Sequence, residues 1–225
     1  MNKKDINKRY LVFIPLRKGS KRVKNKNFVK VKSKPLIYYT YKEAIKIFKS
    51  ENIFISSNDK QAKIFSQKHN LQYINRPKNL CRDNSKTEDA IIHFIKERKI
   101  KTQNIVLLQA TSPMRSSNDI LRCIKKYEKK KLDSIFSVFK EKNFLWKQKN
   151  NRLISISFNF RNREKSQDMN YIFHENGAIF IFKAKKFLKA KNRIFKKFDY
   201  FEMKKVNSID IDTEEDLKKF KNNLK

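Results

Sequence analysis

The sequence predicts an α/β domain, with a mainly parallel sheet of the Rossmann-like kind. Short apolar runs alternate with segments of helical periodicity over about the first 140 residues. Tyr10–Leu16, Ile53–Ser57 and Asn104–Gln109 are such runs, with the continuous apolar character of strands buried on both faces. In folds of this kind, ligands bind in the loops beyond the carboxyl ends of the strands.

The remaining elements of this part of the chain follow from end signals and spacing. Ser85 with Glu88, and Ser117 to Asp119, are typical of helix starts. Helices are expected at Leu36–Ser50, Lys60–His69, Ser85–Arg98 and Ser117–Lys130, and further strands at Leu71–Asn75 and Ser134–Phe139.

After Lys140 the pattern changes. Phe144–Lys149 and Arg152–Phe158 flank Asn150-Asn151, which predicts a hairpin. A strand at Gly177–Lys183, a helix at Ala184–Ala190, and an extended Val206–Asp212 leading to a helix at Glu214–Asn222 capped by Thr213 complete the prediction. We expect one domain over residues 1–225, with residues 140–175 as an insertion.

Composition sets limits on function. The 225 residues include 56 Lys+Arg and 22 Asp+Glu, a net charge of +34, and 39% of the residues are hydrophobic. This apolar content supports a core and argues against disorder. The basic excess invites a nucleic-acid-binding interpretation, but Lys and Arg are spread along the whole chain, as AT-rich codons would also produce. Charge alone therefore does not decide the function.

The expected location is a reducing cytoplasm. No run approaches the roughly 20 apolar residues of a membrane helix, and the start of the chain does not have the pattern of a signal peptide. The two cysteines, Cys81 and Cys123, have no metal-ligand spacing, and the three histidines are scattered, so the sequence does not indicate a zinc site.

Glycine is scarce, which draws attention to the two that occur. An average protein of this length has about 16 glycines, whereas this chain has only Gly19 and Gly177. Gly19 lies in the loop Arg17–Asn27, which combines a hydroxyl with many cations directly after a buried strand. Such a loop can surround a polyphosphate. A solvated basic turn is the alternative, and the loop is not a Walker A motif.

Two carboxylates form a second candidate site near the end of the chain. Asp210 and Asp212 are two residues apart, so an extended strand would point both to the same side. Paired carboxylates near phosphates suit Mg²⁺, although Asp212 could simply favour the following helix N-terminus. Gln109–Arg115 and His174–Ile179 are further polar candidates, and each taken alone could be an ordinary turn.

Taken together, these segments resemble the acylneuraminate cytidylyltransferases, or CMP-sialic acid synthetases. The resemblance runs in order from about Tyr10 to Phe220. It rests on Ile14–Arg22, Lys26-Asn27, Lys34–Leu36, Arg76-Pro77, Leu108–Arg115, Glu175–Phe180 and Asp210–Leu217.

The resemblance implies transfer of CMP from CTP to a nonulosonic sugar acid, with Mg²⁺, in a homodimer with a nucleotidyltransferase fold. It also implies that the small β-rich insertion at residues 140–175 contributes to dimerisation and to the sugar pocket. It assigns the CTP phosphates to Arg17, Ser20, Lys21 and Lys26, with Asn27 beside them, and the cytosine end to Arg76 and Thr87. It assigns the sugar to Gln109, Ser112, Arg115, Gln167, Asn176 and Phe180, the metal to Asp210 and Asp212, and catalysis to Arg17, Lys26 and Asp210.

The stretch before Asn176 departs from the family pattern. Ser166–Asn170 replaces the more usual Arg-Gln-x-Leu-Pro, and His174 follows. The acceptor therefore stays open among sialic, pseudaminic, legionaminic and 3-deoxy-manno-octulosonic acids. A basic nucleic-acid-binding protein on the same fold, with no specific nucleic acid implied by any motif, is the alternative from another class.

Overall fold

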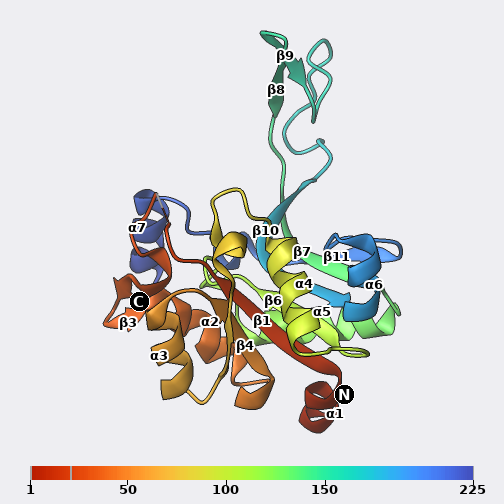
Figure 1. The fold of residues 1–225 in the computed structure, drawn as a ribbon. Helices are drawn as coiled ribbons and strands as arrows, with labels where there is room; N and C mark the ends of the chain where they lie inside the picture. Colours follow the sequence, from red (N-terminus) through yellow and green to blue (C-terminus); the bar gives the residue numbers. More distant parts are fainter. Residues whose placement is uncertain (1, 21, 225) are drawn as a thin grey trace.

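The core of the protein is a seven-stranded sheet, in the order β11-β7-β10-β6-β1-β4-β5 (Figure 1). The computed structural model describes residues 2–20 and 22–224. The strands of this sheet are β1 (Tyr10–Leu16), β4 (Ile53–Ser57), β5 (Gln72–Asn75), β6 (Asn104–Leu108), β7 (Ser134–Glu141), β10 (Ile172–Lys183) and β11 (Phe198–Glu202). All neighbouring pairs are parallel except those that β10 makes with β6 and β7. The predicted mainly parallel sheet is thus confirmed.

Helices cover both faces of this sheet. They are α1 (Lys3–Arg9), α2 (Leu36–Ala44), α3 (Lys60–Lys68), α4 (Thr87–Glu97), α5 (Ser117–Lys129), α6 (Ala184–Ala190) and α7 (Glu214–Asn223). Alternate residues of β1 point to opposite faces: Val12 and Ile14 pack in the cluster that contains α2, α3 and α5. Phe13 packs in the cluster that contains α4 and α6. A third, smaller cluster joins α7 to α2 and to the loop after β1.

Short elements complete the chain. They are the ribbon β2 (Lys30–Val31) with β3 (Lys34–Pro35), the hairpin β8 (Trp146–Lys149) with β9 (Arg152–Ser155), and the 3₁₀ turns η1 (Lys26–Phe28), η2 (Ser50–Asn52), η3 (Lys78–Cys81) and η4 (Lys205–Ser208). No helix in the described part of the chain has the length and apolar character needed to cross a membrane.

The hairpin lies at the end of an arm, residues 142–171, that rises from β7 and β10 well away from the body (Figure 1). Asn150 and Asn151 both have positive φ, 48° and 58°, as a type I′ turn requires, so the predicted hairpin is confirmed. Several large apolar side chains of the arm are exposed, among them Trp146, Leu153 and Ile156.

Four expectations need correction. The helix expected to reach Ser50 ends at Ala44, where a tight turn takes Ile47 and Phe48 into the core. The helix expected to be capped by Ser85 has its N-cap at Lys86, whose N–H donates to the Asp89 carboxylate.

The other two corrections concern the start and the end of the chain. Val206–Asp212 is a 3₁₀ turn followed by an extended loop, without a ladder partner, and not a strand. The helix α1, the edge strand β11 and the short ribbon of β2 and β3 have no counterpart among the expected elements.

Candidate active site

A cavity of about 600 Å³ opens beyond the carboxyl ends of β1 and β6. Four parts of the chain line it: the loop after β1, the segment from β5 to α4, the loop after β6, and the segment before α7. Its residues are Pro15, Arg17, Ser20, Arg22, Lys26, Asn27, Arg76, Leu80, Asp83, Ser85, Lys86, Thr87, Gln109, Thr111, Asp210 and Asp212. This is the sheet edge at which an α/β fold binds its ligands.

Contacts within the loop after β1, and from this loop to other segments, hold it in place. Gly19 has a φ of +93°, a conformation that side chains of L-residues rarely adopt. The Asn27 amide donates to the Arg17 carbonyl at 3.1 Å, and the N–H of Lys18 donates to the Asn58 side chain. Arg17 forms an ion pair with Asp83, 2.8 Å away across the cavity. These contacts present the cations of the loop to the cavity.

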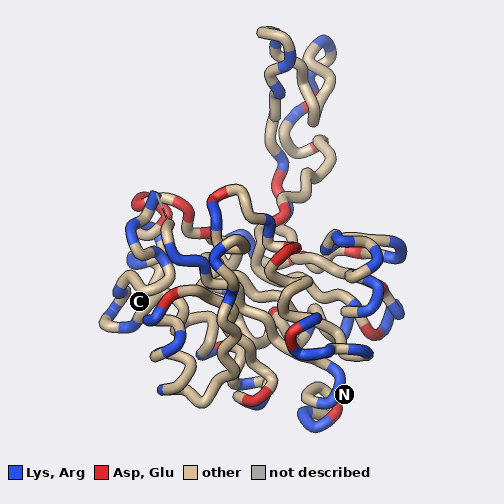
Figure 2. Tube along the Cα trace, viewed as in Figure 1, with Lys and Arg blue, Asp and Glu red and all other residues tan. Residues whose placement is uncertain are grey.

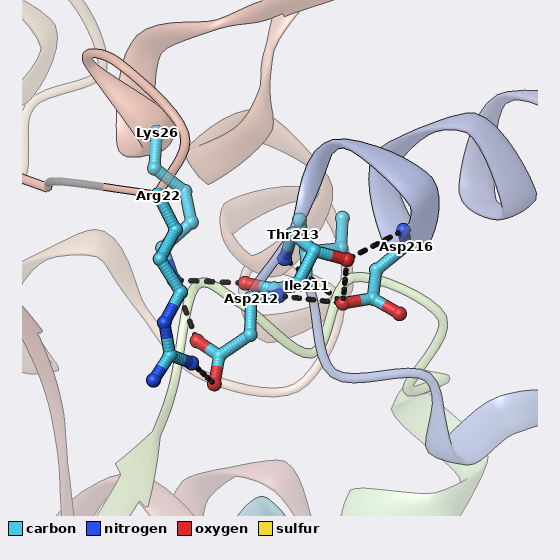
Figure 3. Close-up of polar contacts among 6 residues, drawn as sticks. All are labelled: Arg22, Lys26, Ile211, Asp212, Thr213 and Asp216. Carbon is cyan, nitrogen blue, oxygen red and sulfur yellow. Dashed lines mark hydrogen bonds and ion pairs between the residues drawn. The ribbon is translucent and has the colours of Figure 1, made fainter.

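Lys26 and Arg22 of this loop are joined to the segment before α7 (Figure 3). The Lys26 ammonium lies 2.9 Å from both the Ile211 carbonyl and an oxygen of the Asp212 carboxylate. The Arg22 guanidinium lies 3.2 Å from the other oxygen of Asp212. The Asp212 carboxylate therefore has two protein cations as partners.

A capping box fixes the backbone beside Asp212. The Asp216 carboxylate accepts from the N–H of Asp212, and from both the N–H and the hydroxyl of Thr213, at 2.8–3.1 Å (Figure 3). Thr213 in turn accepts from the N–H of Asp216, as predicted for the N-cap of this helix. The start of α7 thus sets the position of Asp212.

Asp210 lies on the other side of the buried Ile211, whose N–H donates to the Thr111 carbonyl at 2.7 Å. Asp210 is exposed to solvent and forms part of the cavity wall. Desolvation by that wall raises the pKa of Asp210, and the neighbouring Asp212 carboxylate raises it further, against the hydrogen bond from Thr111 and the charge of Lys26. Although the segment is not a strand, both carboxylates face the cavity.

The opposite wall holds the two residues assigned to the cytosine end. Arg76 is buried, and its guanidinium donates to the Ser56 hydroxyl and carbonyl at 3.1 and 2.7 Å, while burial lowers its pKa. Thr87 is the first residue of α4. Both line the cavity, and their contacts with a base stay predictions.

Among the residues assigned to the sugar, Gln109 lines the cavity and Arg115 lies behind it. The buried Arg115 guanidinium donates to the carbonyls of Gln109 and Ala178, at 3.2 and 2.9 Å, and to the Thr40 hydroxyl at 2.9 Å. Burial lowers the pKa of Arg115 to about 10, so it stays charged at neutral pH. Its contact with the Gln109 carbonyl fits a positioning role, and its predicted contact with the sugar stays a prediction.

Three more of these residues are buried outside the cavity lining. Ser112 and Asn176 pack together behind Gln109, and the Asn176 amide is satisfied by the hydroxyls of Ser137 and Ser208, at 2.6 and 2.8 Å. Phe180 is a core residue of β10, and the Arg193 guanidinium stacks over its ring. Their predicted sugar contacts stay predictions.

The last two assigned residues lie elsewhere. Gln167 is exposed on the arm, and its carbonyl accepts from Lys142. Lys21, assigned to the phosphates, falls outside the described residues.

Arg22, Asp83 and Thr111 are among the cavity residues to which the sequence analysis gave no role. Arg22 and Thr111 lie inside motifs already noted. Their closeness in sequence to the assigned residues could have indicated that they line the same cavity. Asp83 stands in a polar turn without any motif, and only the fold brings it opposite Arg17.

The carboxylate oxygens of the cavity fit Mg²⁺ if phosphate oxygens complete its coordination shell. No group of three or more His, Cys, Asp or Glu side chains among the described residues could hold a metal by itself. The Asp210–Asp212 pair offers two carboxylates, and their mutual repulsion, which raises the pKa of Asp210, is what a cation would relieve. Mg²⁺ commonly uses one or two carboxylates together with substrate phosphates and waters.

The positive charge of the whole chain is not concentrated at this cavity. Lys and Arg occur in every part of the trace, including the arm and the edge farthest from the arm (Figure 2). Spread along the trace in this way (Figure 2), the charge by itself does not favour nucleic acid as a partner.

The sheet and cavity define a nucleotidyltransferase fold, and solved structures share it. CMP:2-keto-3-deoxy-manno-octonic acid synthetase, solved in complex with CTP, matches with a TM-score of 0.68 at 15% identity, over 96% of this chain and 98% of that one. 4-Diphosphocytidyl-2C-methyl-D-erythritol synthase matches with a TM-score of 0.69 at 10% identity, over 96% and 99%. At these identities the likeness concerns the fold.

The sequence gives the family. The cytidylyltransferase family model matches residues 11–224, and the chain belongs to this family. N-acylneuraminate cytidylyltransferase of Streptococcus agalactiae serotype III is 27% identical over 212 residues, covering 92% of this chain and 51% of that protein. Pseudaminic acid cytidylyltransferase of Campylobacter jejuni is 26% identical over 217 residues, covering 92% of both. The chain thus spans about half the length of the first relative and nearly all of the second.

Proposed function

We propose that this protein transfers CMP from CTP to the anomeric hydroxyl of a nonulosonic sugar acid and releases pyrophosphate. One observation carries the proposal: the cationic loop after β1 faces the Asp210–Asp212 pair across a single cavity at the nucleotide-binding edge of the sheet. Membership of the cytidylyltransferase family supports CTP as the donor.

The chemistry follows from the charges on the cavity walls. The oxygen of the sugar hydroxyl forms a bond to the α-phosphorus of CTP, the bond from this phosphorus to the oxygen that bridges to the β-phosphate breaks so that pyrophosphate leaves, and the hydroxyl proton passes to water. Negative charge then grows on the non-bridging oxygens and on pyrophosphate. Arg17 and Lys26 stabilise this charge more strongly in the transition state than in the ground state. Asp210 orients the attacking hydroxyl of the sugar acid.

We propose Mg²⁺ as the cofactor, held by Asp210 and Asp212 together with nucleotide phosphate oxygens. When bound, the ion would supply charge neutralisation at the phosphates and would acidify a coordinated hydroxyl. The support for it is the oxygen donor set described above.

The acceptor is a sialic-type acid or a close analogue. The relatives carry the names of N-acylneuraminate and pseudaminic acid enzymes, which supports this substrate class and keeps both acids in view, beside legionaminic and 3-deoxy-manno-octulosonic acids. Gln109 is the side chain best placed to face the acceptor, since it lines the cavity near Asp210 and Thr111.

We further propose a homodimer that works in the cytoplasm. The exposed apolar residues of the arm support association through this arm, because large exposed apolar patches commonly mark interfaces. The free thiols Cys81 and Cys123 fit a reducing compartment.

The test is pyrophosphate release with Mg²⁺, using CTP, ATP, GTP or UTP, each with a panel of the four acids. Release with CTP and one acid is the expected result, and that acid is the acceptor. Lys26→Gln should abolish most of the pyrophosphate release. Glu51→Gln also removes one charge, at an exposed position in η2, and should leave the release intact. No release from any nucleotide by folded protein would contradict the proposal.

A further inference from the structure

The Asp212 carboxylate has two roles that it cannot fill at the same time: partner of two protein cations, and ligand of the proposed metal ion. In the free chain it bridges two cations of the loop after β1, Arg22 and Lys26 (Figure 3). The proposed function needs those cations for nucleotide phosphates, and needs Asp212 for the divalent cation. A carboxylate oxygen already held by a guanidinium or ammonium group is a poorer metal ligand than a free one.

We propose that Arg22 is a further phosphate-binding residue of the nucleotide site, and that Asp212 is its internal competitor. A triphosphate entering the cavity takes over Arg22 and Lys26 from Asp212, and the released carboxylate becomes available to the cation that accompanies the nucleotide. This inference rests on the proposed function for the identity of the nucleotide, but the competition itself concerns only phosphate.

The geometry favours such an exchange. The Arg22 side chain is 71% exposed and Asp212 is 53% exposed, so neither is locked by packing. Exposed ion pairs contribute little to stability and are easily replaced. A phosphate group offers more negative charge and more acceptor oxygens than a carboxylate, and a guanidinium can bind it with two parallel hydrogen bonds.

Two features limit the rearrangement when Asp212 is released. The Lys26 side chain is only 14% exposed and also donates to the Ile211 carbonyl at 2.9 Å, so it keeps a backbone partner. The backbone of Asp212 is tied to the Asp216 carboxylate at 3.1 Å, so the exchange needs only a rotation of the Asp212 side chain. The cavity wall itself stays as it is.

The first experiment measures CTP binding without divalent metal, by calorimetry in EDTA at physiological ionic strength. Asp212→Asn removes the competitor, so we expect CTP to bind about threefold to tenfold more tightly than to the wild type. Cytidine, which has no phosphate, should bind both proteins alike. Glu51→Gln removes one negative charge far from the cavity and should leave CTP binding unchanged. An unchanged CTP affinity in Asp212→Asn, or an equal gain for cytidine, would overturn the proposal.

A double-mutant cycle separates competition from simple repulsion between Asp212 and phosphate. Arg22→Gln alone should weaken metal-free CTP binding about threefold, with cytidine unaffected. In this background the gain from Asp212→Asn should be smaller, because one of the two contested cations is gone. The same gain in both backgrounds would mean that Asp212 acts only through its charge, and the exchange would be refuted.

These measurements do not depend on turnover. If no nucleotide releases pyrophosphate but the binding cycle behaves as described, the exchange stands and the proposed reaction fails. If pyrophosphate is released but Asp212→Asn does not tighten metal-free binding, the reaction stands and the exchange fails.

Discussion

Asp210 is a side chain whose proposed role would come at a cost to stability. Desolvation by the cavity wall and the charge of Asp212 raise its pKa, so its ionised form is less favourable in the folded chain than in the unfolded one. For a carboxyl with a raised pKa, ionisation weakens the fold, and stability is lost as the pH rises through the folded pKa. At neutral pH the protein therefore carries this cost.

Asp210→Asn should lower turnover by about a hundredfold or more, because the acceptor side of the cavity loses its charge. The same variant should melt at a slightly higher temperature at pH 7, by no more than about 2 °C, because the strained charge is gone. Pyrophosphate release at saturating Mg²⁺ and thermal unfolding measure the two effects. Turnover near that of the wild type would refute the role of Asp210.

Arg115 is the second residue whose environment decides its role. It is 1% exposed and donates to groups on α2, on the loop after β6 and on β10. Removing a buried charged donor leaves its acceptors without partners, which costs more than the net value of the bonds themselves.

Arg115→Met should lower the free energy of unfolding by about 3 kcal/mol. Denaturant unfolding measures this loss. Arg152→Met, which makes the same chemical change on the exposed hairpin, should be nearly neutral. If Arg115 instead served the ligand alone, its replacement would reduce activity and leave the unfolding curve in place.

At the level of elements, the start of α7 connects helix capping to the site. Burial disfavours the charge of Asp216, but the hydrogen bonds from Thr213 and from the Asp212 N–H outweigh it and hold the Asp216 pKa below its ordinary value. A carboxyl with a lowered pKa stabilises the fold above its unfolded pKa of about 3.8. This contribution disappears as the pH falls through the folded pKa.

Asp216→Asn should therefore cost about 1 kcal/mol of stability at pH 7, which is about 2–4 °C in melting temperature. The difference from the wild type should shrink below pH 3.8 as the native carboxyl becomes protonated. Thermal melts across this pH range make the comparison. Glu215→Gln, on the exposed side of the same helix turn, is the matched control and should change little.

At the scale of the whole molecule, the arm is the part that does not pack against the main core. It carries exposed apolar side chains far from the main core, and its aromatic residues pack mostly on one another, as Trp146 does on Phe158. A lone two-stranded hairpin is only marginally stable in water. The proposed association of two chains through this arm would cover its apolar surface.

Leu153→Lys combined with Ile156→Lys should therefore convert the protein to a monomer near 27.2 kDa by light scattering. Both side chains are more than half exposed, so the body should remain folded. Ile64→Lys, an equally exposed position on α3, should leave the dimer intact. A wild-type mass of one chain would contradict the proposed homodimer.

Local sequence signals predicted much of this molecule. The buried strands were visible as uninterrupted apolar runs, because a strand covered on both faces has no polar face to alternate with. The start of α7 was visible because a capping box needs only four neighbouring residues. By contrast, β11 was missed because it is a short edge strand with exposed residues, and α1 because it buries Ile6 alone.

The sequence by itself determined the α/β class, the cationic loop after β1 and the nearness of Asp210 to Asp212, since each depends on residues close together in the chain. Only the tertiary structure decided which side chains meet across the cavity. Arg17 faces Asp83 over 66 residues and Lys26 faces Asp212 over 186. It also decided that Arg115 is buried and donates to the Gln109 carbonyl. Such pairings depend on how strands and loops far apart in the chain are packed, and no local pattern encodes that packing.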